Sequence, residues 1–145
     1  MSTLEMTRIF AAPQEKVFAH LTQTDFLLNW WGPEGTIIAD HALSFAAPGP
    51  WWATMVGPQG HPATVGGEVK QIDPPEMVEL TLSFRMEDGT NGPESVIRFT
   101  LDTTPQGRTK LTLTQSGLNP EHIADMRDKG WNSALARLEQ LVTAD

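Results

Sequence analysis

The chain contains no cysteine, which excludes a disulfide framework and any metal site built on thiolates. It also contains no apolar run of about 18 residues, the length that a membrane-spanning helix requires. Residues 1–8 lack the basic start and the apolar stretch of a signal peptide. From these absences we expect a cytoplasmic protein that is neither exported nor inserted into a membrane.

Positive charge is scarce. Ten Lys and Arg residues stand against 18 Asp and Glu residues, which gives a formal net charge of −8. A surface of this sign repels nucleic-acid phosphates and anionic lipids, and no cluster of Lys or Arg offsets it. We therefore expect no nucleic-acid partner.

The residue patterns of common catalytic and metal sites are missing. The sequence has neither a Gly-x-Ser-x-Gly turn for a nucleophile nor a Gly-Lys-Ser/Thr loop for phosphate. Its four histidines are scattered, and the spacing of His122 and Asp125 is typical of a solvated helix face as well as of a metal site. We expect no metal, no cofactor and no catalytic residue, so the sequence favours a binding protein over an enzyme.

Apolar and polar residues alternate along most of the chain, with the period of β-strands. The alternation is clearest in 77–86, where Val78, Leu80, Leu82 and Phe84 share one face. Two short helices are expected after the first strand, one opened by residues 12–16 and one over 24–31. The expected strands are 4–10, 36–45, 51–56, 61–72, 77–86, 95–103 and 110–116.

The C-terminal segment has the strongest helical pattern. Asn119 and Pro120 suit its start, and Gly130 is expected to let its backbone approach the sheet. An apolar stripe at spacings of three and four then follows, formed by Trp131, Ala134, Leu135, Leu138, Leu141 and Val142. This helix is the only element long enough to cover an antiparallel sheet, so we predict an α+β fold in which a curved sheet surrounds the helix, with residues 1–145 as one domain.

Four of the five tryptophans form two adjacent pairs, Trp30-Trp31 and Trp51-Trp52. Neighbouring strand residues face opposite sides, so we expect Trp51 to face the sheet's covered side and Trp52 to face solvent. In the first pair, one indole faces a ligand or both close the junction between helix and sheet. The second arrangement is favoured because large aromatic side chains usually lie in the core.

Several short motifs follow one another over nearly the whole chain: Val17-Phe18, Asn29-Trp30-Trp31, Gly67-Glu68-Val69, Asp73-Pro74-Pro75-Glu76, Thr114-Gln115-Ser116-Gly117 and Gly130-Trp131. In this order they resemble the family of homologues of the activator of Hsp90 ATPase, within the START-like and Bet v 1-like helix-grip superfamily. The resemblance implies a helix-grip fold with a cavity between the sheet and the long helix. It also implies membership of a group that includes lipid carriers, polyketide cyclases and chaperone co-factors.

The cavity of such a fold is the expected site. Gln115 continues the inward alternation of its strand, and Glu68 and Arg127 are the charged candidates for orienting a polar ligand group or a catalytic water. For these two charged residues, an ion pair or solvent exposure is the alternative. The predicted ligand-binding residues are Trp51, Met55, Glu68, Leu80, Leu82, Phe84, Phe99, Gln115, Met126 and Arg127.

The sequence thus predicts a protein that binds a small, mostly apolar molecule. The alternatives are an Hsp90-type chaperone co-factor and a small cyclase-like or hydrolase-like enzyme that uses the same cavity. The resembled activators carry an additional N-terminal domain, for which 145 residues leave no room. A homodimer formed through the strand of Trp52 is a further alternative. A cavity of about 300 Å³ or more would distinguish ligand binding from a fully packed core.

Overall fold

The computed structural model describes residues 2–32, 35–86 and 88–144. One strand, β1 (Ser2–Phe10), precedes two short helices, α1 (Gln14–Thr22) and α2 (Thr24–Leu27). Six strands follow: β2 (Ile37–Ala42), β3 (Gly49–Val56), β4 (Pro62–Asp73), β5 (Met77–Phe84), β6 (Ser95–Thr103) and β7 (Thr109–Leu118). The predicted order of elements is confirmed, although α2 ends earlier than expected.

The chain ends in one uninterrupted helical run with three kinds of turn. It comprises a 3₁₀ turn (η1, Pro120–His122), a short α-helix (α3, Ile123–Asp125), a π-helical segment (η2, Met126–Trp131) and a longer α-helix (α4, Asn132–Thr143). Asn119 caps the start, because its side chain accepts a hydrogen bond from the backbone N–H of Glu121. Within the described residues, no helix combines the length and the apolar character needed to cross a bilayer.

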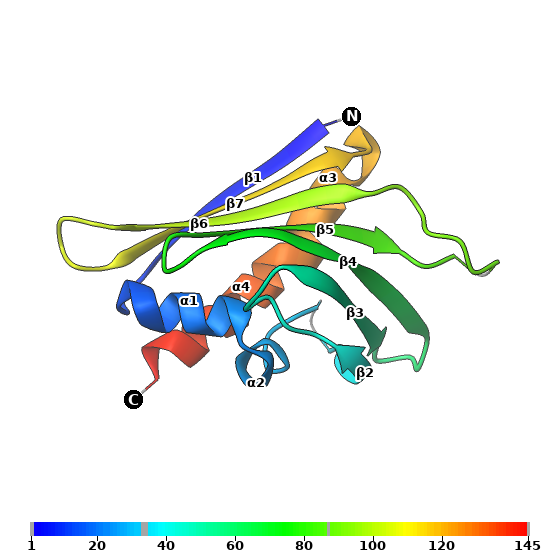
Figure 1. Ribbon diagram of the computed structural model, residues 1–145, viewed down its shortest axis with the longest axis horizontal. Coiled ribbons are helices and arrows are strands. Elements are labelled where there is room, and N and C mark those ends of the chain that lie inside the picture. Colours follow the sequence, from blue (N-terminus) through cyan, green and yellow to red (C-terminus); the bar gives the residue numbers. More distant parts are fainter. Residues whose placement is uncertain (1, 33–34, 87, 145) are drawn as a thin grey trace.

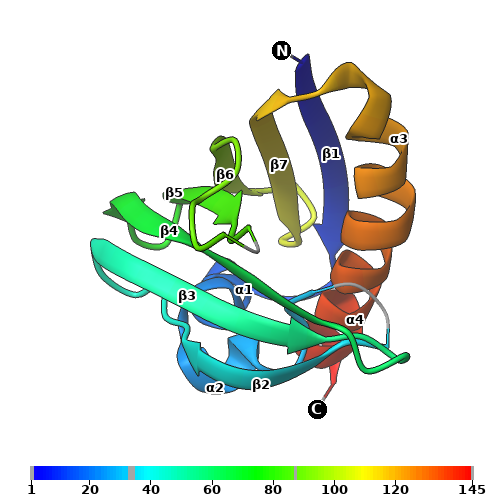
Figure 2. The same ribbon diagram turned by 90° about the vertical axis from the view of Figure 1, so that its right-hand side faces the viewer.

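The strands form one antiparallel sheet in the order β1-β7-β6-β5-β4-β3-β2 (Figure 1). β1 pairs with β7, so the first and last strands lie side by side at one end of the sheet. The sheet curls, so that β1 and β7 run crosswise to β2 and β3, and the helical run lies across its open side (Figure 2). The predicted α+β helix-grip fold is confirmed.

A single hydrophobic cluster fills the space between α4 and the sheet. Leu135, Leu138 and Val142 of α4 are almost fully buried, as the predicted stripe requires. They share the cluster with Leu111 and Leu113 of β7, which alternate inward with period two. Burial of such side chains typically contributes about 1.5–3 kcal/mol each, so the α4 end of the helix is firmly held to the sheet.

Tryptophans join the helices to the sheet. Trp30 is fully buried and donates its indole N–H to the carbonyl of His20 at 2.8 Å. The ring of Trp31 makes edge-to-face contacts with Trp51 and Trp131 at centroid distances of 5.7 and 5.8 Å. Trp52 is 37% exposed, whereas Trp51 is 2% exposed, so the predicted division of that pair between the two faces is confirmed.

Strands β4 and β5 approach closely beside Thr81, and Gly67 permits this approach. A Cβ atom on Gly67 would lie 2.1 Å from the carbonyl oxygen of Thr81. That carbonyl accepts a hydrogen bond from the indole N–H of Trp51 at 3.1 Å, and the hydroxyl of Thr81 accepts one from the backbone N–H of Glu68 at 2.9 Å. No other residue type fits at this position without moving one of the two strands.

We predict that Gly67→Ala lowers the free energy of unfolding by about 2–3 kcal/mol, because the added methyl group meets rigid backbone. Gly57→Ala is the control, since nothing lies within 4 Å of a Cβ at Gly57. Urea unfolding followed by circular dichroism measures both values. Equal stability of the two variants, within about 0.5 kcal/mol, would contradict the close approach of β4 and β5.

Candidate functional site

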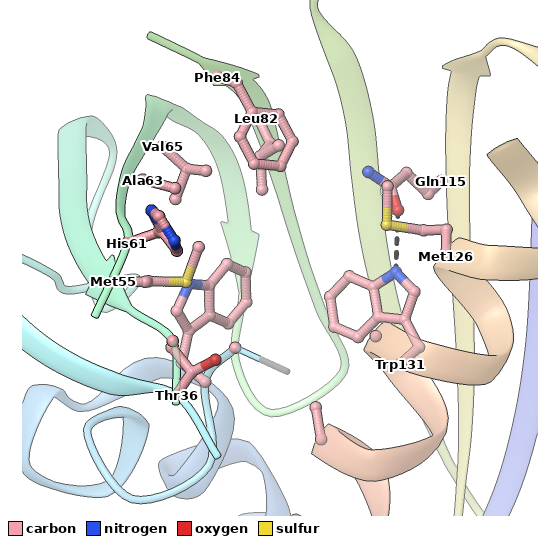
Figure 3. Close-up of a pocket in the computed structure, with 15 residues that line it drawn as sticks. Thr36, Met55, His61, Ala63, Val65, Leu82, Phe84, Gln115, Met126 and Trp131 are labelled. Atoms are coloured by element: carbon pink, nitrogen blue, oxygen red, sulfur yellow. Dashed lines mark hydrogen bonds between the residues drawn. The ribbon is translucent and has the colours of Figure 1, made fainter. Parts of the chain in front are cut away.

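A cavity of about 290 Å³ lies between the sheet and the helical run and opens to solvent. Strands β3 and β4 form one wall with Met55, Ala63 and Val65, and β5 adds Leu82 and Phe84. Figure 3 shows these side chains facing Met126 and Trp131 of the helical run. The walls are thus almost entirely apolar, which is typical of small-molecule sites.

The helical wall is built by the π-helical segment η2. Its wider turn ends with the N–H of Asn132 donating to the carbonyl of Arg127, five residues earlier. The segment brings Met126, Gly130 and Trp131 to the cavity, and Ala134 of α4 follows. Single π-helical turns inside α-helices occur frequently at functional sites.

Gly130 marks the place where the helix backbone itself meets the cavity. A Cβ atom at this position would meet only the sulfur of Met126, at an ordinary contact distance of 3.8 Å. The expectation that Gly130 lets the helix approach the sheet is therefore wrong, because no sheet atom lies within contact distance of that Cβ position. The missing side chain leaves space in the cavity.

A chain of hydrogen bonds links the helix to three strands at the edge of the cavity. The indole N–H of Trp131 donates to the side-chain carbonyl of Gln115 at 2.8 Å (Figure 3). The amide N–H of Gln115 donates to the hydroxyl of Ser95 at 2.9 Å, and that hydroxyl donates to the carbonyl of Leu82 at 3.2 Å. Since Gln115 is 1% exposed, its amide needs these partners, and in turn it fixes the orientation of the Trp131 ring.

Five of the ten predicted site residues line the cavity: Met55, Leu82, Phe84, Gln115 and Met126. Their contact with a ligand stays a prediction, whereas their position on the wall is a structural fact. The alternation along β5 and β7 placed Leu82, Phe84 and Gln115 on the correct face of the sheet.

Three predicted residues lie deeper than the cavity wall. Leu80 and Phe99 are fully buried in the core, and Phe99 contacts the ring of Trp131 edge-to-face at 5.9 Å. Trp51 is inward-facing as expected, but its ring packs against Trp31 and Phe45, away from the cavity wall. These three side chains support the wall from behind.

The expected positions of Glu68 and Arg127 were wrong. The side chain of Glu68 is 59% exposed and lies 3.6 Å from the ammonium of Lys70, while the inward face of β4 belongs to Val65 and Val69. Arg127 is also exposed and pairs with Asp128 at 3.1 Å. Neither lines the cavity, where a charge without a partner would cost several kcal/mol. The alternative of ion pairs at the surface is correct for both.

Other lining residues were not predicted as part of the site. Trp31 lines the cavity and also contacts the ring of Trp51 in the core. It therefore combines the two roles expected of this pair, facing the cavity and closing the junction between helix and sheet. Ala63 follows from the register of β3 and β4, because it lies opposite Met55. The turn at 57–60 is recognisable in the sequence, so counting residues outward from it along both strands would have paired Met55 with Ala63.

Charge is nearly absent from the cavity. His61, an exposed residue at the mouth, is the only ionisable side chain among the described lining residues. No group of three or more His, Cys, Asp or Glu side chains suited to a metal ion occurs in the part of the chain that the structure describes. The polar contacts available inside are therefore neutral hydrogen bonds, above all those of Gln115.

A curved antiparallel sheet that holds a long C-terminal helix and leaves an apolar cavity between them defines the helix-grip class. Residues 11–143 match the family model described as Activator of Hsp90 ATPase homolog 1-like protein, and the chain belongs to this family. None of the curated proteins matches the sequence significantly.

Solved structures agree with this assignment. An AHSA1 protein from Silicibacter pomeroyi is 31% identical, with a TM-score of 0.89 over 97% of this chain and 96% of that chain. A protein from Chromobacterium violaceum has the same fold, with 22% identity, a TM-score of 0.86 and full coverage of both chains. A protein from Mycobacterium smegmatis is 25% identical, with a TM-score of 0.77 over 99% of this chain and 91% of that chain.

We predict that Gln115→Met lowers the free energy of unfolding by about 1–3 kcal/mol, because the buried indole N–H of Trp131 loses its acceptor. Methionine has a similar length and offers no comparable acceptor. Gln106→Met is the matched control, since Gln106 lies in an exposed turn. Urea unfolding measures the two variants, and an equal stability for both would show that the hydrogen bond to Trp131 contributes nothing.

Proposed function

We propose that the protein binds a small, mostly apolar molecule in the cavity between the sheet and the helical run. The observation that supports this proposal is the cavity of about 290 Å³ with apolar walls beside the hydrophobic core. Voids larger than a water molecule are few in protein interiors. Apolar walls that face no partner atoms also lose dispersion contacts, which a ligand would restore.

The volume limits the size of the ligand. Small-molecule sites range from about 300 to 1,000 Å³, so this cavity, at about 290 Å³, lies just at the lower limit of that range. An apolar cavity of about 150 Å³ takes up benzene, and the cavity here has nearly twice that volume. A ligand the size of two fused rings or of a medium-length alkyl chain fits this space.

Two alternative functions, a chaperone co-factor and a small enzyme, are suggested by the family name and by the fold. The words Hsp90 ATPase in the family name refer to a chaperone, which would be the partner of a co-factor. A cyclase-like or hydrolase-like reaction needs acid and base groups inside the pocket, and His61 at the mouth is the single ionisable group among the described lining residues. Ligand binding needs only the cavity and its apolar walls.

We expect naphthalene or 1-octanol to bind the protein, as measured by titration calorimetry, and Gly130→Leu to weaken that binding at least about tenfold. The leucine side chain would project into the cavity from the helix backbone. Replacing a helical glycine also favours the helix by up to about 1 kcal/mol, so the variant is expected to fold. Ala136→Leu is the control, because Ala136 lies on the exposed face of α4.

Two results would refute the proposal. One is that neither probe binds and that native mass spectrometry of the protein from its own cells shows no retained small molecule. The other is that the probes bind Gly130→Leu as tightly as they bind the unaltered protein, which would place them outside this cavity. Circular dichroism of both variants verifies that they are folded.

A further inference from the structure

We infer that the ligand is a neutral aromatic molecule of one or two rings that carries a hydroxyl group, with the ring among the apolar walls and the hydroxyl at Gln115. This inference rests on the proposed function and specifies its ligand. Three features of the cavity carry it: the aromatic and sulfur-containing walls, the unused hydrogen-bonding capacity of one buried amide, and the lack of charge.

The walls favour a ring over an alkyl chain. Trp31, Phe84 and Trp131 bring aromatic rings to the cavity, and Met55 and Met126 bring thioether groups. Trp31 and Trp131 lie nearly perpendicular, with an interplanar angle of 80°. A ligand ring that packs against these walls can make aromatic contacts as well as contacts with sulfur, which an alkyl chain cannot.

Gln115 has hydrogen-bonding capacity left. A carboxamide offers two N–H donors and two acceptor lone pairs on its oxygen. Its nitrogen uses one N–H on Ser95, and its oxygen accepts one hydrogen bond, from Trp131. One donor and one acceptor therefore remain on a side chain that lines the cavity.

A hydroxyl group matches this remainder, because it donates and accepts at the same oxygen. A ligand without polar atoms would leave this donor and this acceptor unused, so it would gain no hydrogen bond from Gln115.

The lack of charge excludes an ionised group at the amide end. No Lys, Arg, Asp or Glu is among the described residues that line the cavity, and the one ionisable group, His61, belongs to the exposed mouth. A carboxylate beside Gln115 would be desolvated without a counter-charge. The polar group that enters the cavity is therefore neutral.

Four probes at pH 7 test this inference by titration calorimetry: 2-naphthol, naphthalene, 1-octanol and 2-naphthoate. We expect 2-naphthol to bind about tenfold more tightly than naphthalene, the factor that a well-placed hydrogen bond supplies. We expect 1-octanol to bind more weakly than 2-naphthol because it lacks the ring, and 2-naphthoate to bind most weakly because it is charged.

The variant Gln115→Met separates recognition from structural support. Any change in the shape of the wall affects naphthalene and 2-naphthol alike, so the ratio of their affinities reports the amide itself. We expect that ratio to fall from about ten to about one in Gln115→Met and to stay unchanged in Gln106→Met. Circular dichroism and the binding of naphthalene show that each variant keeps its fold and its cavity.

The outcomes distinguish this inference from the proposed function. If naphthalene, 1-octanol or 2-naphthoate binds as tightly as 2-naphthol, or if the ratio persists in Gln115→Met, the inference is wrong and the binding function stands. If none of the four probes binds and no molecule is retained from the cells, both are wrong.

Discussion

The hydrogen bond between Trp131 and Gln115 is the constraint on which the site depends. At the α4 end, the helix packs directly on the sheet through Leu135 and Leu138. At the η2 end, Gly130 and Met126 leave a space that side chains do not fill. The hydrogen bond between Trp131 and Gln115 lies where η2 meets α4 and fixes the distance of the indole from β7. The α4 half of the helical run therefore packs on the sheet, while the η2 half leaves a space. The cavity therefore depends both on the packed α4 half, which holds the helix in place, and on the η2 half, which leaves the space.

Strands β3 to β5 supply the opposite wall. The backbones of β4 and β5 approach closely at Gly67, and Trp51 is anchored there by its hydrogen bond to Thr81. Trp31 packs on that anchored ring and on Trp131, so its position is set from both sides of the cavity. Three distant parts of the sequence thus share one aromatic cluster, and a change in any of them is felt by the other two.

The sequence predicted the fold because local patterns and topology agreed. Alternation defined the strands, and the stripe at spacings of three and four defined α4. The site was half predicted, because alternation shows which face a residue occupies but not its depth: Leu80 and Leu82 share a face, yet only Leu82 reaches the cavity. The position of Arg127 could not be predicted, because a π-helical turn breaks the period of 3.6 residues that a regular α-helix has.

The π-helical segment has a consequence for how such a protein diversifies. Each residue of an α-helix turns the chain by about 100°, so a wider turn shifts the phase between the segments before and after it. A deletion of one residue within 126–131 would replace the wider turn with a regular α-helical one and change which side chains of this segment reach the cavity. The cavity would change shape, while the sheet and the packing of α4 stayed the same. The shape of the cavity and the packing of the α4 half thus depend on different stretches of one helical run.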